Sequence, residues 1–197
     1  SVHGIQCGMV KTEYPGTSAI PLVCDSPHSG THYPDDFNDA VDFADLRRCE
    51  DTHVEKLWAA VPAVGGTLVH ATFPRSYTDT NRTEFDIDVR MIDGVWPGRA
   101  EPSQRCLALG NGLVFSKTTT LQSIYDRKLS IAEVQHRIET CWRPYRQTLA
   151  QARTRVETIA TASGTLDPVD ARLVVKLFAL ERLLDQHFRK PGKGRLP

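Results

Sequence analysis

Short apolar runs alternate with polar loops along the first half of the chain. Residues 19–24 (AIPLVC) form an apolar run that leads into the polar loop DSPHSG, which predicts a buried strand ending at that loop. Residues 44–61 carry apolar side chains at three- and four-residue spacing, so they predict a helix that ends before Pro62. Residues 67–73 (TLVHATF) alternate and predict a second strand. The order strand, helix, strand predicts an α/β fold.

The second half of the chain has weaker strand signals and stronger helix signals. Glycine and proline between residues 90 and 106 indicate a surface excursion, and residues 113–115 are a short strand candidate. Ser130, with Glu133 three residues later, forms a capping box, which predicts an amphipathic helix that continues to about residue 159. A last helix is expected after Asp167, followed by a basic tail.

Composition and charge exclude several classes of protein. The 197 residues correspond to one domain, 1–197, and 40% hydrophobic with 24% charged residues is ordinary globular composition. Basic and acidic residues number 24 each, so a net charge of zero gives no attraction to nucleic acid. Because no apolar run approaches the roughly 20 residues of a membrane span and no secretory signal is evident, we expect a cytoplasmic protein with neither membrane nor nucleic-acid partners. The five scattered cysteines indicate reduced thiols.

The loop after the first predicted strand holds the densest group of polar side chains. Asp25 and His28 lie where an open α/β sheet collects its ligands, and Glu50, Asp51 and His53 follow in the next polar segment. Imidazole and carboxylate can supply two of the three protein ligands of a catalytic zinc, with Asp25 holding the second ring nitrogen of His28. The alternative is a loop histidine satisfied by the backbone, with helix-start charges at Glu50 and Asp51.

A second polar segment, residues 73–82 (FPRSYTDTNR), follows the second predicted strand. Arg75 and Arg82 present planar donor forks and Asn81 adds a neutral donor, so together they suit a carboxylate of a small ligand. The alternative is a surface loop in which the two arginines pair with nearby acids such as Asp79 and Asp86.

Taken together, these segments resemble one known family. The blocks PLVCDSPHSGTHYPDDF, RRCEDTHVEKLW, ATFPRSYTDTNRTEFDID, GLVF and IYDRKLSIAEVQHRIETCWRPY occur in the order and spacing of the N-formylglutamate amidohydrolase family, across residues 18–150. The resemblance implies a three-layer α/β fold, a mixed sheet flanked by helices, related to zinc carboxypeptidases. It also implies a zinc-dependent amidohydrolase that cleaves N-formyl-L-glutamate, or a related N-acyl amino acid, to glutamate and formate in histidine catabolism.

The same resemblance assigns roles to individual residues. His28 and Asp51 would bind one zinc ion, and Glu50 is the competing carboxylate and the candidate to carry a proton to the leaving amine. The expected partner is a small-molecule substrate with carboxylate groups, because zinc polarises the formyl carbonyl while arginines orient a dianion. The substrate-binding residues would come from both loops: Ser29, Arg75, Asn81 and Arg82.

After residue 152 the chain departs from the family pattern. The family's third metal-binding histidine, in a D-C-H-S-M block, and its later catalytic glutamate have no counterpart in residues 153–197, where we expect a divergent helical C-terminus. The one histidine of that segment is His187, in a predicted amphipathic helix. We therefore expect a relative that is truncated at the C-terminus or altered in frame, whose uncovered sheet edge favours a homodimer.

Two other functions fit the same residues less completely. An inactive relative would keep the carboxylate-binding pocket and act as a binding module for small dianionic ligands, which the missing third ligand favours. A serine hydrolase would use Ser26 or Ser29 with His28 or His53, but the G-x-S-x-G elbow of such enzymes does not occur in the sequence.

Overall fold

The computed structural model describes residues 4–7, 9–16 and 18–162, which form a mixed α/β structure. The main sheet has the strand order β1-β2-β4-β3. β1 and β2 form an antiparallel hairpin, β2 is antiparallel to β4, and β3 is parallel to β4, so the sheet is mixed as predicted. Its strands are β1 Gly4–Cys7, β2 Val10–Glu13, β3 Val23–Ser26 and β4 Thr67–Ala71. A small parallel sheet joins β5 Ile92–Asp93 to β6 Leu129–Ser130.

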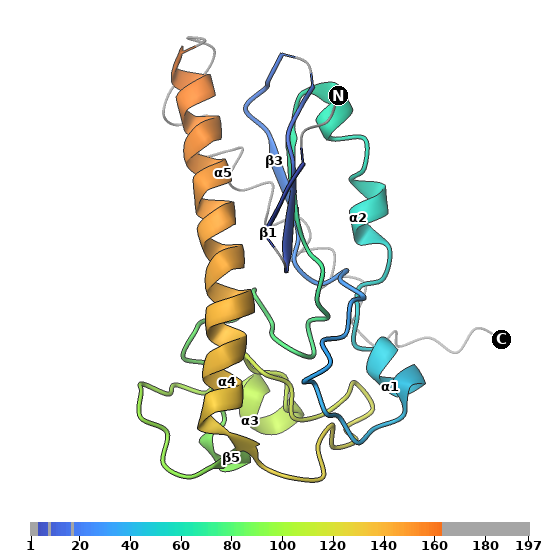
Figure 1. Cartoon of the computed structure of the whole chain (residues 1–197), viewed down its shortest axis with the longest axis vertical. Helices are drawn as coiled ribbons and strands as arrows, with labels where there is room; N and C mark the ends of the chain where they lie inside the picture. Colours follow the sequence, from blue (N-terminus) through green and yellow to red (C-terminus); the bar gives the residue numbers. More distant parts are fainter. Residues whose placement is uncertain (1–3, 8, 17, 163–197) are drawn as a thin grey trace, which may run out of the picture.

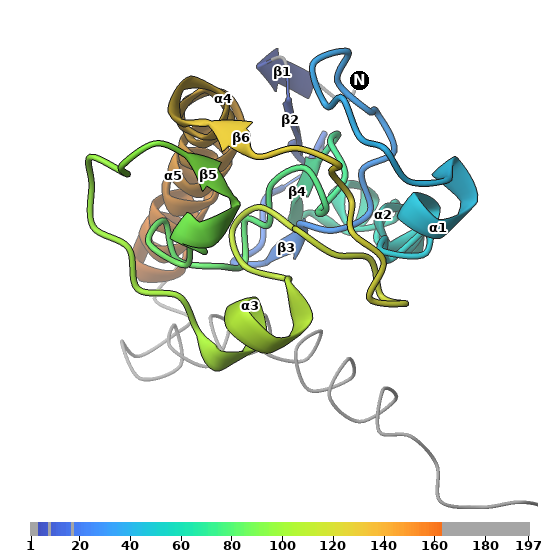
Figure 2. The same ribbon diagram turned by 90° about the horizontal axis from the view of Figure 1, so that it is seen from below.

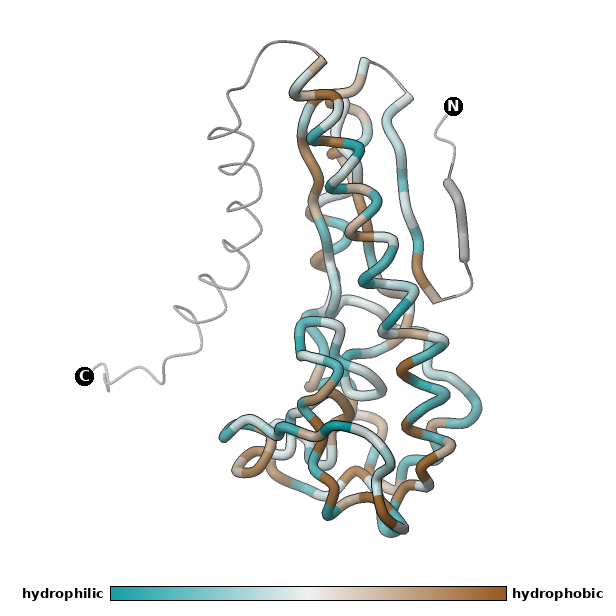
Figure 3. The backbone as a smooth tube through the Cα atoms, turned by 90° about the vertical axis from the view of Figure 1, so that its left-hand side faces the viewer, coloured by the Kyte–Doolittle hydropathy of each residue, from teal (hydrophilic) through white to brown (hydrophobic). Residues whose placement is uncertain are grey.

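Helices cover both faces of the main sheet. The helices are α1 Phe43–Arg47, α2 Val54–Leu57, α3 Gln104–Leu109, α4 Ile131–Arg137 and α5 Arg143–Ala162, with 3-10 turns at Pro62–Val64 and Val89–Met91. The long helix α5 packs against β2, β3 and β4 on one face, and α1 and α2 lie on the other side (Figures 1 and 2). Apolar and polar segments alternate along α5 (Figure 3), as expected for a helix with one buried face.

Helix α4 begins as its capping box predicts. The hydroxyl of Ser130 accepts from the backbone N–H of Glu133 at 3.2 Å, and the Glu133 carboxylate accepts from the N–H of Ser130 at 2.7 Å. A π-helical turn, Ile138–Trp142, joins α4 to α5. Pro144 follows this turn and does not end the helix, so the predicted helix across residues 145–159 is confirmed.

The single helix predicted for residues 44–61 is wrong, because two short helices, α1 and α2, flank a turn. In a continuous helix the N–H of Asp51 would bond the carbonyl of Arg47. It bonds the carbonyl of His28 instead, at 3.1 Å. His53 then adopts a left-handed conformation with φ of 70°. A tertiary hydrogen bond to the β3 loop therefore overrides the helical pattern.

Other predicted elements are right in place but not in extent. The strand predicted at residues 19–24 is β3, which begins at Val23, where its pairing with β4 begins, and includes Asp25. Residues 113–115 form no strand, since one isolated bridge joins Asn111 to Phe115. The hairpin β1–β2 and helix α3 had no counterpart in the sequence-based prediction. The helix predicted after Asp167 lies outside the described residues.

The hydrophobic core extends from the sheet into the loops. Buried apolar side chains come from the strands, the loops and α4, among them Val69, Phe73, Leu113, Ile124 and Val134. The loops after β3 and β4 are thus held by a packed base, which favours a precise arrangement of polar groups on them. None of the helices in the described ranges combines the length and the apolarity that a membrane span requires.

Candidate active site

Two loops meet where β3 and β4 end. Because these strands are parallel, their carboxyl ends lie at the same edge of the sheet, where α/β folds bind ligands. The N–H of His32 in the β3 loop donates to the carbonyl of Thr72 in the β4 loop at 2.8 Å. Gly30 permits this contact, since a Cβ there would lie 2.2 Å from the carbonyl oxygen of Phe73. The two predicted polar segments are therefore brought together.

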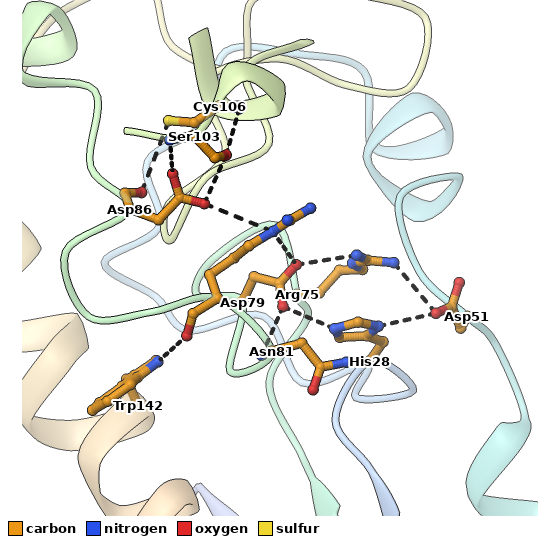
Figure 4. Close-up of polar contacts among 10 residues, drawn as sticks. His28, Asp51, Arg75, Asp79, Asn81, Asp86, Ser103, Cys106 and Trp142 are labelled. Carbon is orange, nitrogen blue, oxygen red and sulfur yellow. Dashed lines mark hydrogen bonds and ion pairs between the residues drawn. The ribbon is translucent and has the colours of Figure 1, made fainter. Parts of the chain in front are cut away.

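His28 stands at the centre of this contact, buried, with a carboxylate at each ring nitrogen. Its Nδ1 lies 3.1 Å from Oδ2 of Asp51, and its Nε2 lies 2.8 Å from Oδ1 of Asp79 (Figure 4). Burial lowers the pKa of His28, but the charge of Asp79 and the hydrogen bonds to both acids outweigh it and raise the pKa above the ordinary value. Each ring nitrogen of His28 therefore faces a carboxylate oxygen.

Arg75 links the same two acids from the other side. Its guanidinium nitrogens lie 3.3 Å from Oδ2 of Asp51 and 3.0 Å from Oδ2 of Asp79 (Figure 4), and its Cζ lies 5.5 Å from the ring centroid of Phe115. Asp79 is fully buried, which raises its pKa, but His28 and Arg75 outweigh burial and hold that pKa well below the usual range. The site is a largely buried ring formed by two acids, Asp51 and Asp79, with His28 and Arg75 between them.

The loop that carries Asp79 is fixed by several backbone contacts. The N–H of Asp79 donates to the carbonyl of Leu113 at 2.7 Å, so residues 112–115 (GLVF) hold this part of the loop. The N–H of Asn81 donates to Oδ1 of Asp79 at 2.9 Å, which makes an Asx turn. The indole N–H of Trp142 donates to the carbonyl of Arg82 at 3.0 Å. The loop is therefore held at Asp79, Asn81 and Arg82.

Asn81 and Arg82 keep donors that are not closely engaged by acids. The exposed side-chain amide of Asn81 makes no hydrogen bond within the part of the chain that the structure describes. The Nε of Arg82 lies 3.7 Å from Asp79 and 4.0 Å from Asp86, which are long ion pairs. Arg75 lies closer to its two acids, Asp51 and Asp79. The sequence-based alternative expected such pairing between an arginine and nearby acids, but on the surface, whereas Arg75 is buried.

Two other predicted residues, Asp25 and Ser29, make their hydrogen bonds outside the ring of charges. Asp25, expected to hold the second nitrogen of His28, instead accepts from the hydroxyl of Tyr145 at 3.1 Å. Asp79 takes that position, and sequence reasoning had considered it only as a surface partner of the arginines. The hydroxyl of Ser29 bonds the hydroxyl of Ser26 at 2.7 Å, and both are buried.

Glu50 is directed away from His28, although it precedes Asp51. Its carboxylate accepts from the hydroxyl of Tyr33, and it lies 3.1 Å from a guanidinium nitrogen of Arg47. Burial raises the pKa of Glu50 despite both contacts. Its predicted role as a proton carrier stays a prediction.

Two of the ring atoms suit a metal ion. In a tetrahedral zinc site, ligand nitrogen and oxygen atoms are separated by about 3.3 Å, and the 3.1 Å between His28 Nδ1 and Asp51 Oδ2 is close to this. A carboxylate on the other nitrogen, as Asp79 provides, is the usual support of a metal-binding histidine. Within residues 4–162, gaps excepted, no group of three or more potential ligands gathers. The described residues fit two protein ligands, while His187 lies outside them.

Comparison with known proteins agrees with the resemblance found in the sequence. A model of the N-formylglutamate amidohydrolase family matches residues 20–164. Among solved structures, the crystal structure of N-formylglutamate amidohydrolase from Ralstonia eutropha JMP134 matches with 48% sequence identity and a TM-score of 0.73. The match covers 80% of this chain and 55% of that one, so the chain spans just over half the length of this relative. A search of curated proteins found no match.

Neither match favours the alternative prediction of an inactive binding module. The mixed α/β fold, the polar blocks and the two comparisons lead to one assignment. The chain belongs to the N-formylglutamate amidohydrolase family.

Proposed function

We propose that the chain is part of a metal-dependent amidohydrolase that cleaves N-formyl-L-glutamate, or a closely related N-acyl amino acid, to glutamate and formate. One observation carries the proposal. A buried histidine bonds two carboxylates from separate segments, in a chain that shares 48% identity with an N-formylglutamate amidohydrolase. The relation to zinc carboxypeptidases, the place in histidine catabolism and the cytoplasmic location belong to the same proposal.

Nδ1 of His28 and Oδ2 of Asp51 would hold the metal ion, which we expect to be zinc. When bound, zinc supplies Lewis-acid polarisation of the formyl carbonyl and a more acidic water. To bind the ion, Nδ1 of His28 would have to be unprotonated, while Asp79 would keep the ring in place through Nε2. Arg75 stays between Asp51 and Asp79 and balances their charge.

Asn81 and Arg82 are the groups best placed to bind the two carboxylates of the substrate. Both follow Asp79 in the same turn, and their donors are the least engaged of the loop. A guanidinium fork and an amide donor together orient a carboxylate, which lowers the entropic part of the barrier. Arg75 adds positive charge beside them, although both of its terminal nitrogens already contact acids. Direct contacts of Ser29 and Arg75 with substrate stay predictions.

The test measures zinc per chain and the release of glutamate from N-formyl-L-glutamate with zinc restored. Zinc retention and turnover that are both lost in His28→Ala, and kept in His32→Ala, are the expected result. His32 is the matched control because it is an exposed histidine of the same loop. Equal zinc content in His28→Ala would remove His28 from the site. Glutamate retention without hydrolysis would instead identify a binding module for dianions.

A further inference from the structure

Arg137, the last residue of α4, is the largest fully buried side chain in the described part of the chain. Its guanidinium lies within an aromatic cage formed by Phe37, Tyr77 and Tyr125. The distances from Cζ to these ring centroids are 5.4, 4.2 and 5.5 Å. One of its terminal nitrogens donates to the hydroxyl of Tyr125 at 2.7 Å. A full positive charge is therefore enclosed by aromatic faces.

The partners of this buried charge are neutral. Beyond the cage, the guanidinium donates to the carbonyls of Tyr77 at 3.5 Å and Phe37 at 3.4 Å. Among the described residues no carboxylate forms an ion pair with it, and its Nε has no hydrogen-bond partner. Burying a cation without an anion is costly, and an apolar side chain of similar volume would fill the cage at lower cost. Packing alone does not explain the charge.

Tyr77 connects the cage to the active site. It lies in the β4 loop, between Arg75 and Asp79, and Arg137 holds both its carbonyl and its ring. Its hydroxyl donates to both carboxylate oxygens of Asp36 at 2.9 Å. Tyr77 is thus fixed at its backbone, its ring and its hydroxyl. Two residues further on, Asp79 contacts the ring of His28.

The same helical segment holds the loop at a second point. Trp142, at the end of the π-helical turn that follows Arg137, donates to the carbonyl of Arg82. Residues five apart diverge by about 140° around a regular α-helix. A π-helical turn is wider and brings such residues closer to one side, and turns of this kind are frequent at functional sites. The irregular turn lets Arg137 and Trp142 contact one loop.

We propose that Arg137 is a positioning residue of this active site, which acts through Tyr77 to fix residues 75–79 so that Asp79 meets His28 and Arg75 meets Asp51. The inference rests on the proposed function only for the choice of substrate. The bond between His28 and Asp79 reports the positioning directly, without turnover.

The test compares NMR spectra of the full chain and of its variants Arg137→Lys and Arg137→Met, each with ¹⁵N-labelled histidines. The Nε2 proton of His28, bonded to Asp79, gives a downfield imidazole resonance that is assigned by its loss in His28→Asn. We expect both variants to shift or broaden this resonance well below their unfolding temperatures. We also expect kcat/KM for N-formyl-L-glutamate to fall on the order of a hundredfold, chiefly in kcat, because misplacement by about 1 Å has that effect.

Val156→Ala is the matched control, because it creates a cavity on α5, where it lowers stability without touching the cage. It should leave the resonance and kcat unchanged. An unchanged resonance in both Arg137 variants would overturn the proposal. If those variants fail to fold, Tyr125→Phe decides, since it keeps the ring and removes the 2.7 Å bond to Arg137. A shift in Tyr125→Phe supports the proposal and its absence overturns it. If the His28 resonance shifts in the Arg137 variants but the unmodified chain does not hydrolyse N-formyl-L-glutamate, the proposed function is refuted and the positioning role of Arg137 stands.

Discussion

Replacing Asp79 by asparagine removes one negative charge from the ring of charges and keeps the side-chain volume. The Asp79 carboxylate accepts from His28 at 2.8 Å, from Arg75 at 3.0 Å and from the N–H of Asn81 at 2.9 Å. Asparagine has one acceptor oxygen in place of two. Its NH₂ group would therefore face a donor, either His28 or Arg75, at a position that is fully buried.

The expected loss follows from these contacts. A hydrogen bond to a charged group contributes ~1.5–3 kcal/mol, and removing one partner of a buried ion pair costs ~3–5 kcal/mol. Since the Asn81 contact can survive, we expect Asp79→Asn to lower the free energy of unfolding by ~3–4 kcal/mol. For a chain of this size that corresponds to a decrease in Tm of roughly 10 °C.

The assay is urea unfolding followed by tryptophan fluorescence, with the midpoint and slope fitted for each variant. Glu101→Gln is the control, since Glu101 pairs with Arg99 at 2.7 Å but both are mostly exposed. It should change stability by less than ~0.5 kcal/mol. A loss below ~1 kcal/mol in Asp79→Asn would refute the reasoning, because His28 and Arg75 would then be stable without a buried counter-charge.

Three further predictions concern the surroundings of the site. Gly30→Ala places a Cβ 2.2 Å from the Phe73 carbonyl oxygen, so the two loops must separate, and urea unfolding should show a loss of ~2–4 kcal/mol. The hydrogen bond from Arg127 lowers the pKa of Glu133 to about 2 from 4.5. This pair stabilises the chain above pH 4.5 and is lost as the pH falls toward 2. The difference in unfolding free energy from Glu133→Gln should therefore shrink from ~0.5 kcal/mol at pH 6 to near zero at pH 2, measured by urea titration at each pH. Burial raises the pKa of Cys106 to about 12, so iodoacetamide at pH 8 should leave it unmodified in the native chain by peptide mass spectrometry, and modification there would contradict its burial.

The sequence predicted those elements that local patterns determine. Spacing and cap chemistry predict the two strands that become β3 and β4, the capping box at Ser130 and the helix beyond Pro144. Neither predicts the break between α1 and α2, because the hydrogen bond from Asp51 to the His28 carbonyl joins residues 23 positions apart. No local pattern carries such a contact.

The two residues that sequence reasoning missed share one property. Asp79 lies among arginines, a pattern that fits a solvated surface loop as well as a buried ring. Arg137 is a charged residue on an amphipathic helix, and its cage comes from Phe37, Tyr77 and Tyr125, which are far apart in the sequence. Burial alone separates these charges from ordinary surface charges, and burial depends on the assembled loops.

The adjacent acids Glu50 and Asp51 show how the backbone selects between two residues that the sequence leaves equivalent. The N–H of Asp51 is held by the His28 carbonyl, which brings its carboxylate to Nδ1 of the same histidine. Glu50 lies one position earlier, where its carboxylate meets Tyr33 and Arg47. For Glu50 to replace Asp51 as a metal ligand, it would have to break both contacts, and the half-buried Arg47 would lose its acidic partner. If a metal ion binds at His28, as proposed, this geometry favours Asp51 over Glu50 as its second ligand.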